Sequence, residues 1–102
     1  KEIHLFDTYV AGTTHLKDES VLDEIEVGQK LTLKREINKF DEKAIMLITE
    51  GGKKVGYVPE KDNVIFSRLM DAGKLLSAEV TDIKERNHEF KQISIGIYLI
   101  DF

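Results

Sequence analysis

The chain has 102 residues, no cysteine and a formal net charge of −4 at pH 7. This length is typical of one domain, which we expect to span residues 1–102. The lack of cysteine excludes disulfides and thiol chemistry and fits a reducing compartment. No secretory signal is visible, and no apolar run approaches the roughly 20 residues of a membrane helix. We therefore expect a cytoplasmic protein that has no membrane partner.

The charge is unevenly distributed along the chain. Acidic residues are concentrated in KDESVLDEIE, residues 17–26, and basic residues lie mostly elsewhere. An excess of acid disfavours strong non-specific nucleic-acid binding, which depends on Lys and Arg neutralising phosphates. The sign of the net charge does not exclude such binding, because a local basic patch can exist on an acidic protein.

The first half of the chain reads as strands joined by short connections. IHLFDTYVA predicts a strand over roughly residues 3–11, ended by Gly12, and a helical turn is expected around residues 20–25 in the polar connection that follows. QKLTLKRE, residues 29–36, alternates apolar and polar residues as a half-buried strand does. KAIMLITE and KKVGYVP are joined by Gly51 and Gly52, which predicts a hairpin over residues 43–59.

One helix is predicted after Pro59, around residues 60–72. Four apolar residues fall at helical spacing, Asp62 is suited to the N-cap and Gly73 to the C-terminal stop; the four are Ile65, Phe66, Leu69 and Met70. Two alternating strands follow, LLSAEVTDI at 75–83 and KQISIGIYLI at 91–100, joined by a longer hairpin. We expect a mainly β fold, an OB-like antiparallel barrel of about six strands with one inserted helix. Closure of the sheet into a barrel would hide its edges. A two-layer sheet with a packed helix is the alternative.

The sequence carries no pattern typical of a metal site or of catalysis. His4, His15 and His88 are scattered and have no partner at ligand spacing, so we expect neither a metal ion nor another cofactor. The nucleophile motif G-x-S-x-G is absent, and the glycines form no phosphate loop between a strand and a helix. We therefore expect a protein that is not an enzyme.

The stretch INKFDEKAI, residues 37–45, places Phe40 between the turn-forming residues Asn38 and Asp41. In one interpretation the two polar residues cap a turn and Phe40 closes the core. In the other, Phe40 is a platform for a nucleic-acid base, together with Tyr57 and Phe90, which are otherwise core or hairpin residues. The surrounding basic residues would then form a rim, or they are ordinary solvated charges: Lys34, Arg35, Lys39, Lys43, Lys53, Lys54, Lys61 and Arg68.

Four segments together resemble the HIRAN domain in their order and spacing: VAGTTH at 10–15, LKREINKFDEKAI at 33–45, KKVGYVP at 53–59 and IFSRLMDAG at 65–73. The resemblance covers nearly the whole chain. It implies an OB-like barrel that binds the 3′ end of single-stranded DNA. The family occurs as a standalone bacterial protein and fused to Swi/Snf-class DNA translocases that act on stalled forks.

The resemblance also implies roles for particular residues. Phe40 would stack on the terminal base, Asp41 would accept a hydrogen bond from the 3′-hydroxyl, and Asn38 would contact the end. Tyr57 matches a position that is His in the DNA-binding relative, and His15 matches a second aromatic. Thr14 stands in place of an Arg, and Glu60 stands in place of a Lys, although Lys61 is adjacent. Phe90 matches an aromatic in the last hairpin. The loop is also one residue shorter than the common pattern and lacks its proline. These changes remove positive charge from the expected site.

Two other functions remain open on the sequence. The first is a protein-interaction module without nucleic-acid binding, in which the acidic segment or the same surface docks a partner such as a helicase or nuclease. An exposed edge strand or a flat apolar patch would favour it. The second is a closed small-molecule pocket around the aromatic ring.

Overall fold

Six antiparallel strands form one sheet in the computed structural model, which describes residues 1–13, 16, 19–86 and 90–101. The strands are β1 (Glu2–Tyr9), β2 (Lys30–Arg35), β3 (Ile45–Ile48), β4 (Lys54–Tyr57), β5 (Leu76–Arg86) and β6 (Phe90–Ile100). A 3-10 helix, η2 (Glu19–Glu24), precedes β2, and the α-helix α1 (Asn63–Asp71) follows β4. The prediction of a mainly β, OB-like fold with one helix inserted after the fourth strand is confirmed. The predicted bounds differ from the observed ones by one to three residues, in either direction.

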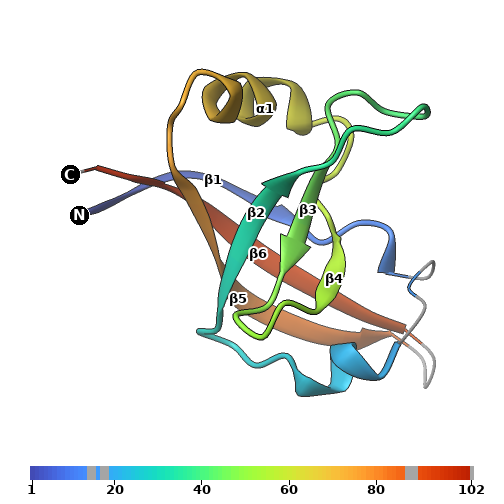
Figure 1. Ribbon diagram of the computed structural model, residues 1–102. Helices are drawn as coiled ribbons and strands as arrows, with labels where there is room; N and C mark the ends of the chain where they lie inside the picture. The colour runs from blue at the N-terminus through green and yellow to red at the C-terminus, as the bar shows by residue number, and fades with distance from the viewer. Residues whose placement is uncertain (14–15, 17–18, 87–89, 102) are drawn as a thin grey trace.

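The sheet curls into a half-barrel with the strand order β1-β6-β5-β2-β3-β4 (Figure 1). In this view α1 lies at one end of the half-barrel and η2 at the other, while the two termini lie side by side. The segment after β1 brings the two edges of the sheet together. Val10 N donates to Ile93 O of β6 at 2.9 Å, and Ala11 exchanges two backbone hydrogen bonds with Tyr57 of β4, at 2.8 and 2.9 Å.

Gly56 makes this closure possible. A Cβ atom at position 56 would lie 2.5 Å from the carbonyl oxygen of Ala11 and 2.6 Å from Cγ1 of Val10. Both distances are shorter than real Cβ contacts, so any side chain would push the two segments apart. The glycine in KKVGYVP therefore permits the close backbone approach that joins β4 to the chain after β1.

Alternation along the strands determines which side chains enter the core. Leu31 and Leu33 of β2 are buried while Thr32 and Lys34 are exposed, as the pattern predicts. Most of the predicted inward rows of β5 and β6 is likewise buried, namely Leu76, Ala78, Val80, Ile93, Ile95 and Ile97. The last predicted member, Leu99, is only partly buried. The apolar residues of β1 differ, because this strand lies at an edge of the sheet and leaves Ile3, Leu5 and Phe6 37–40% exposed.

Helix α1 begins and ends where the sequence indicates. Gly73 has φ of 90° and donates to Met70 O, while the Lys74 N–H donates to Leu69 O, which is a Schellman motif. Asp62 is the N-cap but makes no side-chain cap bond; its carboxylate instead accepts a hydrogen bond from Thr8 Oγ1 at 2.8 Å. Phe66 enters the core, whereas Ile65, despite its helical spacing, is 66% exposed.

Candidate functional site

The loop between β2 and β3, residues 36–44, projects beyond the sheet next to the start of α1 (Figure 1). Its two ends are joined by the hydrogen bond from Glu36 N to Ala44 O, 2.9 Å. Arg35 braces it further, because its guanidinium donates to the carbonyls of Glu42 and Ala44, both at 2.8 Å, and pairs with Asp71 of α1 at 3.0 Å. The loop is thus anchored to both the sheet and the helix.

Asn38 organises the turn inside this loop. Its Oδ1 accepts hydrogen bonds from the backbone N–H groups of Phe40 and Asp41, at 2.9 and 2.7 Å, and its Nδ2 donates to Glu36 Oε2 at 2.8 Å. These are the local side-chain bonds for which Asn is favoured in turns. The structure therefore gives Asn38 the turn-capping role of the first interpretation.

Phe40 does not close the core. Phe40 is 85% exposed. The ammonium of Lys39 lies 5.2 Å from the centroid of its ring. The core interpretation of this residue is wrong, because the turn at Asn38 directs the chain away from the sheet. A large exposed ring on a braced loop is the feature that a binding function would explain.

Asp41 is half-buried and held at both carboxylate oxygens. Oδ1 accepts from Lys43 N at 2.9 Å, and Oδ2 accepts from Nδ2 of Asn63 at 2.8 Å. Asn63 is the first residue of α1 and is only 2% exposed, so this bond satisfies a buried amide. Because an ionised carboxylate offers about four acceptor positions, Asp41 retains capacity for another donor while its orientation is determined by the protein.

Tyr57 forms the opposite wall and belongs to a polar cluster with Glu36. Its hydroxyl donates to Glu36 Oε2 at 2.7 Å and accepts from Lys54 Nζ, which also lies 4.3 Å from the ring centroid. The hydrogen bond from Tyr57, supported by that from Asn38 and by the nearby charge of Lys54, lowers the pKa of Glu36 below its ordinary value. Gly12 packs on the ring, since a Cβ atom there would lie 3.3 Å from Tyr57 Cδ2.

These groups surround an open cleft of about 780 Å³. It is lined by Ala11, Gly12, Asn38, Phe40, Asp41, Ala44, Tyr57, Val58 and Glu60. Four of the predicted site residues thus share one cleft: Asn38, Phe40 and Asp41 from the loop 36–44, and Tyr57 from β4. It is not the closed cavity that the small-molecule alternative required.

Of the remaining predicted site residues, Lys61 has a described side chain and is not part of the lining. Lys61 directs its ammonium toward the ring of Tyr9, 5.6 Å from the centroid, and lies 3.6 Å from Asp62 Oδ2. Phe90 begins β6, paired with Arg86. Thr14 and His15, like His88, lie outside the described residues.

Sequence reasoning did not predict the roles of three residues that hold the groups of the cleft: Arg35, Glu36 and Asn63. Arg35 was considered only for a basic rim, and no role was assigned to Glu36 or Asn63. The pairing of Asn63 with Asp41 joins positions 22 apart in the chain and has no local signal.

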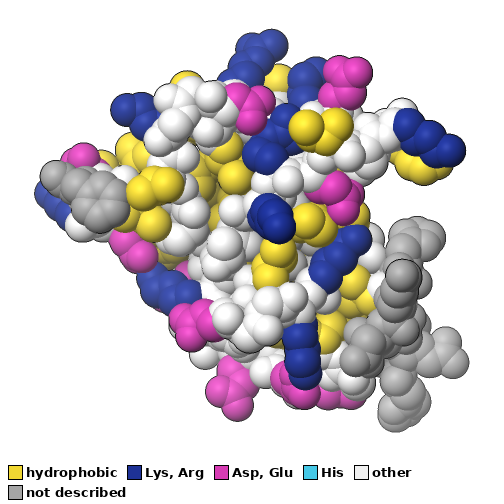
Figure 2. Space-filling model, viewed as in Figure 1, with side chains coloured by type: hydrophobic (Ala, Val, Ile, Leu, Met, Phe, Trp, Pro, Cys, Tyr) yellow, Lys and Arg dark blue, Asp and Glu magenta, His cyan; other side chains and the backbone are white. Residues whose placement is uncertain are grey.

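The charge around the cleft is mixed. Across the face shown in Figure 2, Lys and Arg side chains alternate with Asp and Glu and do not form one basic groove. Among the described residues that line the cleft, Asp41 and Glu60 are acidic and none is Lys or Arg. In the described part of the chain, no group of three His, Cys, Asp or Glu side chains is arranged to hold a metal ion. Nor is any helix there long and apolar enough to cross a membrane.

The half-barrel and its open cleft define a small binding module of the OB-like class. A sequence profile of the HIRAN domain matches residues 3–99. The chain therefore belongs to the HIRAN domain family. HIRAN domains are nucleic-acid-binding modules rather than catalytic domains, so this membership supports a DNA-binding role.

Two solved structures share the fold. A crystal structure of a protein from Lactobacillus plantarum superposes with a TM-score of 0.86 at 26% identity, over 97% of this chain and 95% of that one. The crystal structure of the HIRAN domain of human HLTF gives a TM-score of 0.74 at 16% identity, over 96% of this chain and 78% of that one. No curated protein sequence matches this chain.

Proposed function

We propose that this chain binds the 3′ end of single-stranded DNA in the cleft between Phe40 and Tyr57. The observation that carries the proposal is Phe40, an aromatic ring 85% exposed on a loop braced by the sheet and by α1. An exposed ring offers a stacking face to any base, so little sequence preference is expected.

Asp41 supplies the preference for a particular end. A terminal 3′-hydroxyl is a hydrogen-bond donor, and the Asp41 carboxylate has free acceptor capacity while Lys43 N and Asn63 hold it in place. A 3′-phosphate would instead meet the negative charges of Asp41 and Glu60 in the same cleft. The cleft should therefore discriminate between the two ends by charge as well as by hydrogen bonding.

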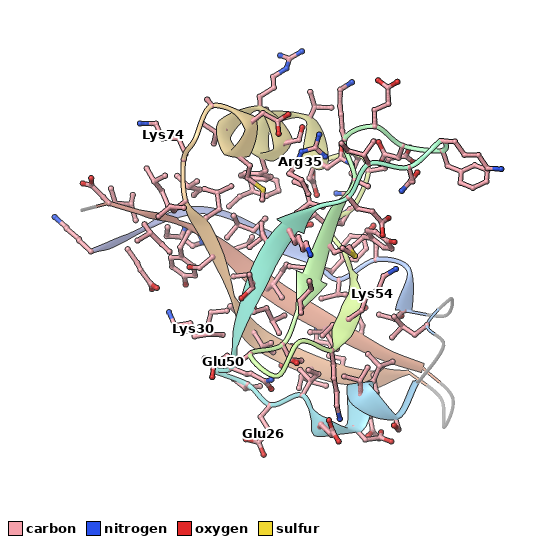
Figure 3. All side chains as sticks on the ribbon, in the orientation of Figure 1. Glu26, Lys30, Arg35, Glu50, Lys54 and Lys74 are labelled. Atoms are coloured by element: carbon pink, nitrogen blue, oxygen red, sulfur yellow. The ribbon has the colours of Figure 1, made fainter. Side chains whose placement is uncertain are left out.

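The test is fluorescence-anisotropy binding of a short labelled oligothymidylate carrying either a 3′-hydroxyl or a 3′-phosphate, at low salt. The parent should bind the hydroxyl form more tightly, and Asp41→Asn should reduce that preference. Glu50→Gln is the matched control, because Glu50 lies in the turn between β3 and β4, away from the cleft (Figure 3). Equal binding of both ends by the parent would contradict end recognition, and an unchanged preference in Asp41→Asn would remove Asp41 from the site. Thermal melting of each variant checks that it is folded.

A second function, docking of a protein partner, is favoured by the edge strand β1. Its apolar residues Ile3, Leu5 and Phe6 are 37–40% exposed, and β1 has β6 as its neighbour on one side in the sheet. An extended segment of a partner protein could add to such an edge, with apolar side chains on Phe6. Phe6→Glu should abolish association of the partner protein with this chain and leave oligothymidylate binding unchanged. A partner protein that still associates with the Phe6→Glu variant would contradict docking at β1.

A further inference from the structure

Both aromatic rings in the cleft have a lysine ammonium beside them. Lys39 Nζ lies 5.2 Å from the centroid of Phe40, and Lys54 Nζ lies 4.3 Å from the centroid of Tyr57 and donates to its hydroxyl. Cation–π contacts are weak at exposed sites. A base that stacks on the face of Phe40 next to Lys39 must displace that ammonium. Lys54 lies beyond the Tyr57 hydroxyl, at the edge of the other stacking face, which it leaves open.

The described residues that line the cleft offer no cation to a phosphate. They include Asp41 and Glu60 but neither Lys nor Arg. Arg35 is already engaged by Asp71 and by two backbone carbonyls, and Lys61 lies against Tyr9 and Asp62. Among the described residues, Lys39 and Lys54 are the cations whose observed contacts are with the cleft's own rings.

We propose that Lys39 and Lys54 bind the phosphates of the ligand, Lys39 leaving the face of Phe40 and Lys54 leaving the hydroxyl of Tyr57 as bases stack on the two rings. This inference rests on the proposed nucleic-acid function and deepens it. Both lysines are exposed, and each has a long flexible stem with a compact charge, which suits movement to a neighbouring phosphate. They would supply positive charge at a cleft whose lining includes the acids Asp41 and Glu60. Glu36, which accepts a hydrogen bond from the Tyr57 hydroxyl, would remain the partner of Tyr57 after Lys54 has moved.

The salt dependence of binding gives a quantitative expectation. Each phosphate neutralised on a single strand adds about 0.7 to the slope of log K against log salt concentration. Between about 50 and 200 mM salt, two such contacts weaken binding about sevenfold and one about 2.6-fold. Lys39→Gln and Lys54→Gln should each lower the slope by about 0.7, and the double variant by about 1.4.

The experiment measures anisotropy of labelled oligothymidylate over this salt range for the parent, the two single variants and Lys74→Gln. Lys74 follows the end of α1 and lies well apart from Lys54 in Figure 3, and its replacement changes the net charge equally. The control should keep the parental slope. If the parent binds but Lys39→Gln and Lys54→Gln also keep that slope, the phosphate role is wrong. If the parent does not bind oligothymidylate at all, the proposed function itself fails.

A second measurement tests the movement of Lys39 directly. Ring currents of Phe40 should shift the ε-methylene protons of Lys39 upfield in the NMR spectrum of the free protein. Phe40→Ala should abolish this shift and so assign it. Added oligothymidylate should move the resonance toward the value of an exposed lysine. A resonance that stays upfield at saturation would contradict the exchange of lysine for base at Phe40.

Discussion

Replacing Phe40 by alanine separates a binding role of this side chain from a structural one. A phenylalanine buries about 150–250 Å² when it is fully enclosed. With 85% of the residue exposed, only about 30 Å² is covered in the folded protein. At about 25 cal/mol per Å², the loss of stability should be no more than about 0.8 kcal/mol.

Binding should respond much more strongly. A base stacked on an aromatic side chain contributes about 1–3 kcal/mol, so Phe40→Ala should weaken oligothymidylate binding about 5- to 150-fold. Urea unfolding measures the first quantity and fluorescence anisotropy the second. Ile37→Ala is the matched control, because Ile37 is 88% exposed on the same loop but does not line the cleft. It should alter neither quantity substantially.

Two results would refute this reasoning. A stability loss of more than about 2 kcal/mol in Phe40→Ala would mean that the ring is packed, since losses of that size come from buried side chains. Unchanged binding by a folded Phe40→Ala would mean that the ring does not stack on the ligand. An equal loss of binding in Ile37→Ala would point to the loop as a whole rather than to the ring.

Three further predictions concern the groups that hold the cleft together. Gly56→Ala places a Cβ atom against the Ala11 carbonyl, which overpacks the site and weakens the bridge between Ala11 and Tyr57. The free energy of unfolding should fall by about 2–4 kcal/mol. Thermal unfolding should show a melting temperature lower by at least about 8 °C. Asn38→Ala removes three hydrogen bonds from the turn and should cost about 1–2 kcal/mol in urea unfolding and also weaken oligothymidylate binding. The pKa of Glu36 is lower in the folded protein than in the unfolded chain. Its carboxylate therefore stabilises the folded state at pH values above the unfolded-state pKa, and this contribution is lost as the pH falls through the folded-state pKa. The difference in stability between the parent and Glu36→Gln should therefore be largest at about pH 7 and shrink below about pH 4.

Each of these has an outcome that contradicts it. Normal melting of Gly56→Ala would mean that the segment after β1 can move away from β4 without cost. Full oligothymidylate affinity in Asn38→Ala would show that the turn does not position the binding groups. A stability difference between parent and Glu36→Gln that grows toward low pH would contradict the direction of the Glu36 pKa shift.

Local patterns in the sequence were enough to predict the elements of the fold. Strand alternation depends on neighbouring residues, and it placed Leu31 and Leu33 in the core correctly. Gly73 ended α1 because a glycine readily adopts the left-handed conformation that terminates a helix, which is a local property of the sequence. The alternation of β1 was less informative, because the sequence does not reveal that this strand lies at the edge and stays partly exposed.

The sequence by itself therefore determined the strand and helix order, the family resemblance and the loop that carries Asn38, Phe40 and Asp41. Only the tertiary structure decided that Phe40 is exposed, that Asp41 is held by Asn63, and that Tyr57 of β4 bonds to Glu36 of the loop. It also showed why position 56 must be glycine, since the Ala11 carbonyl approaches it from a segment 45 residues earlier. Contacts between residues so far apart in the chain depend on how the sheet closes, and no short-range pattern encodes that closure.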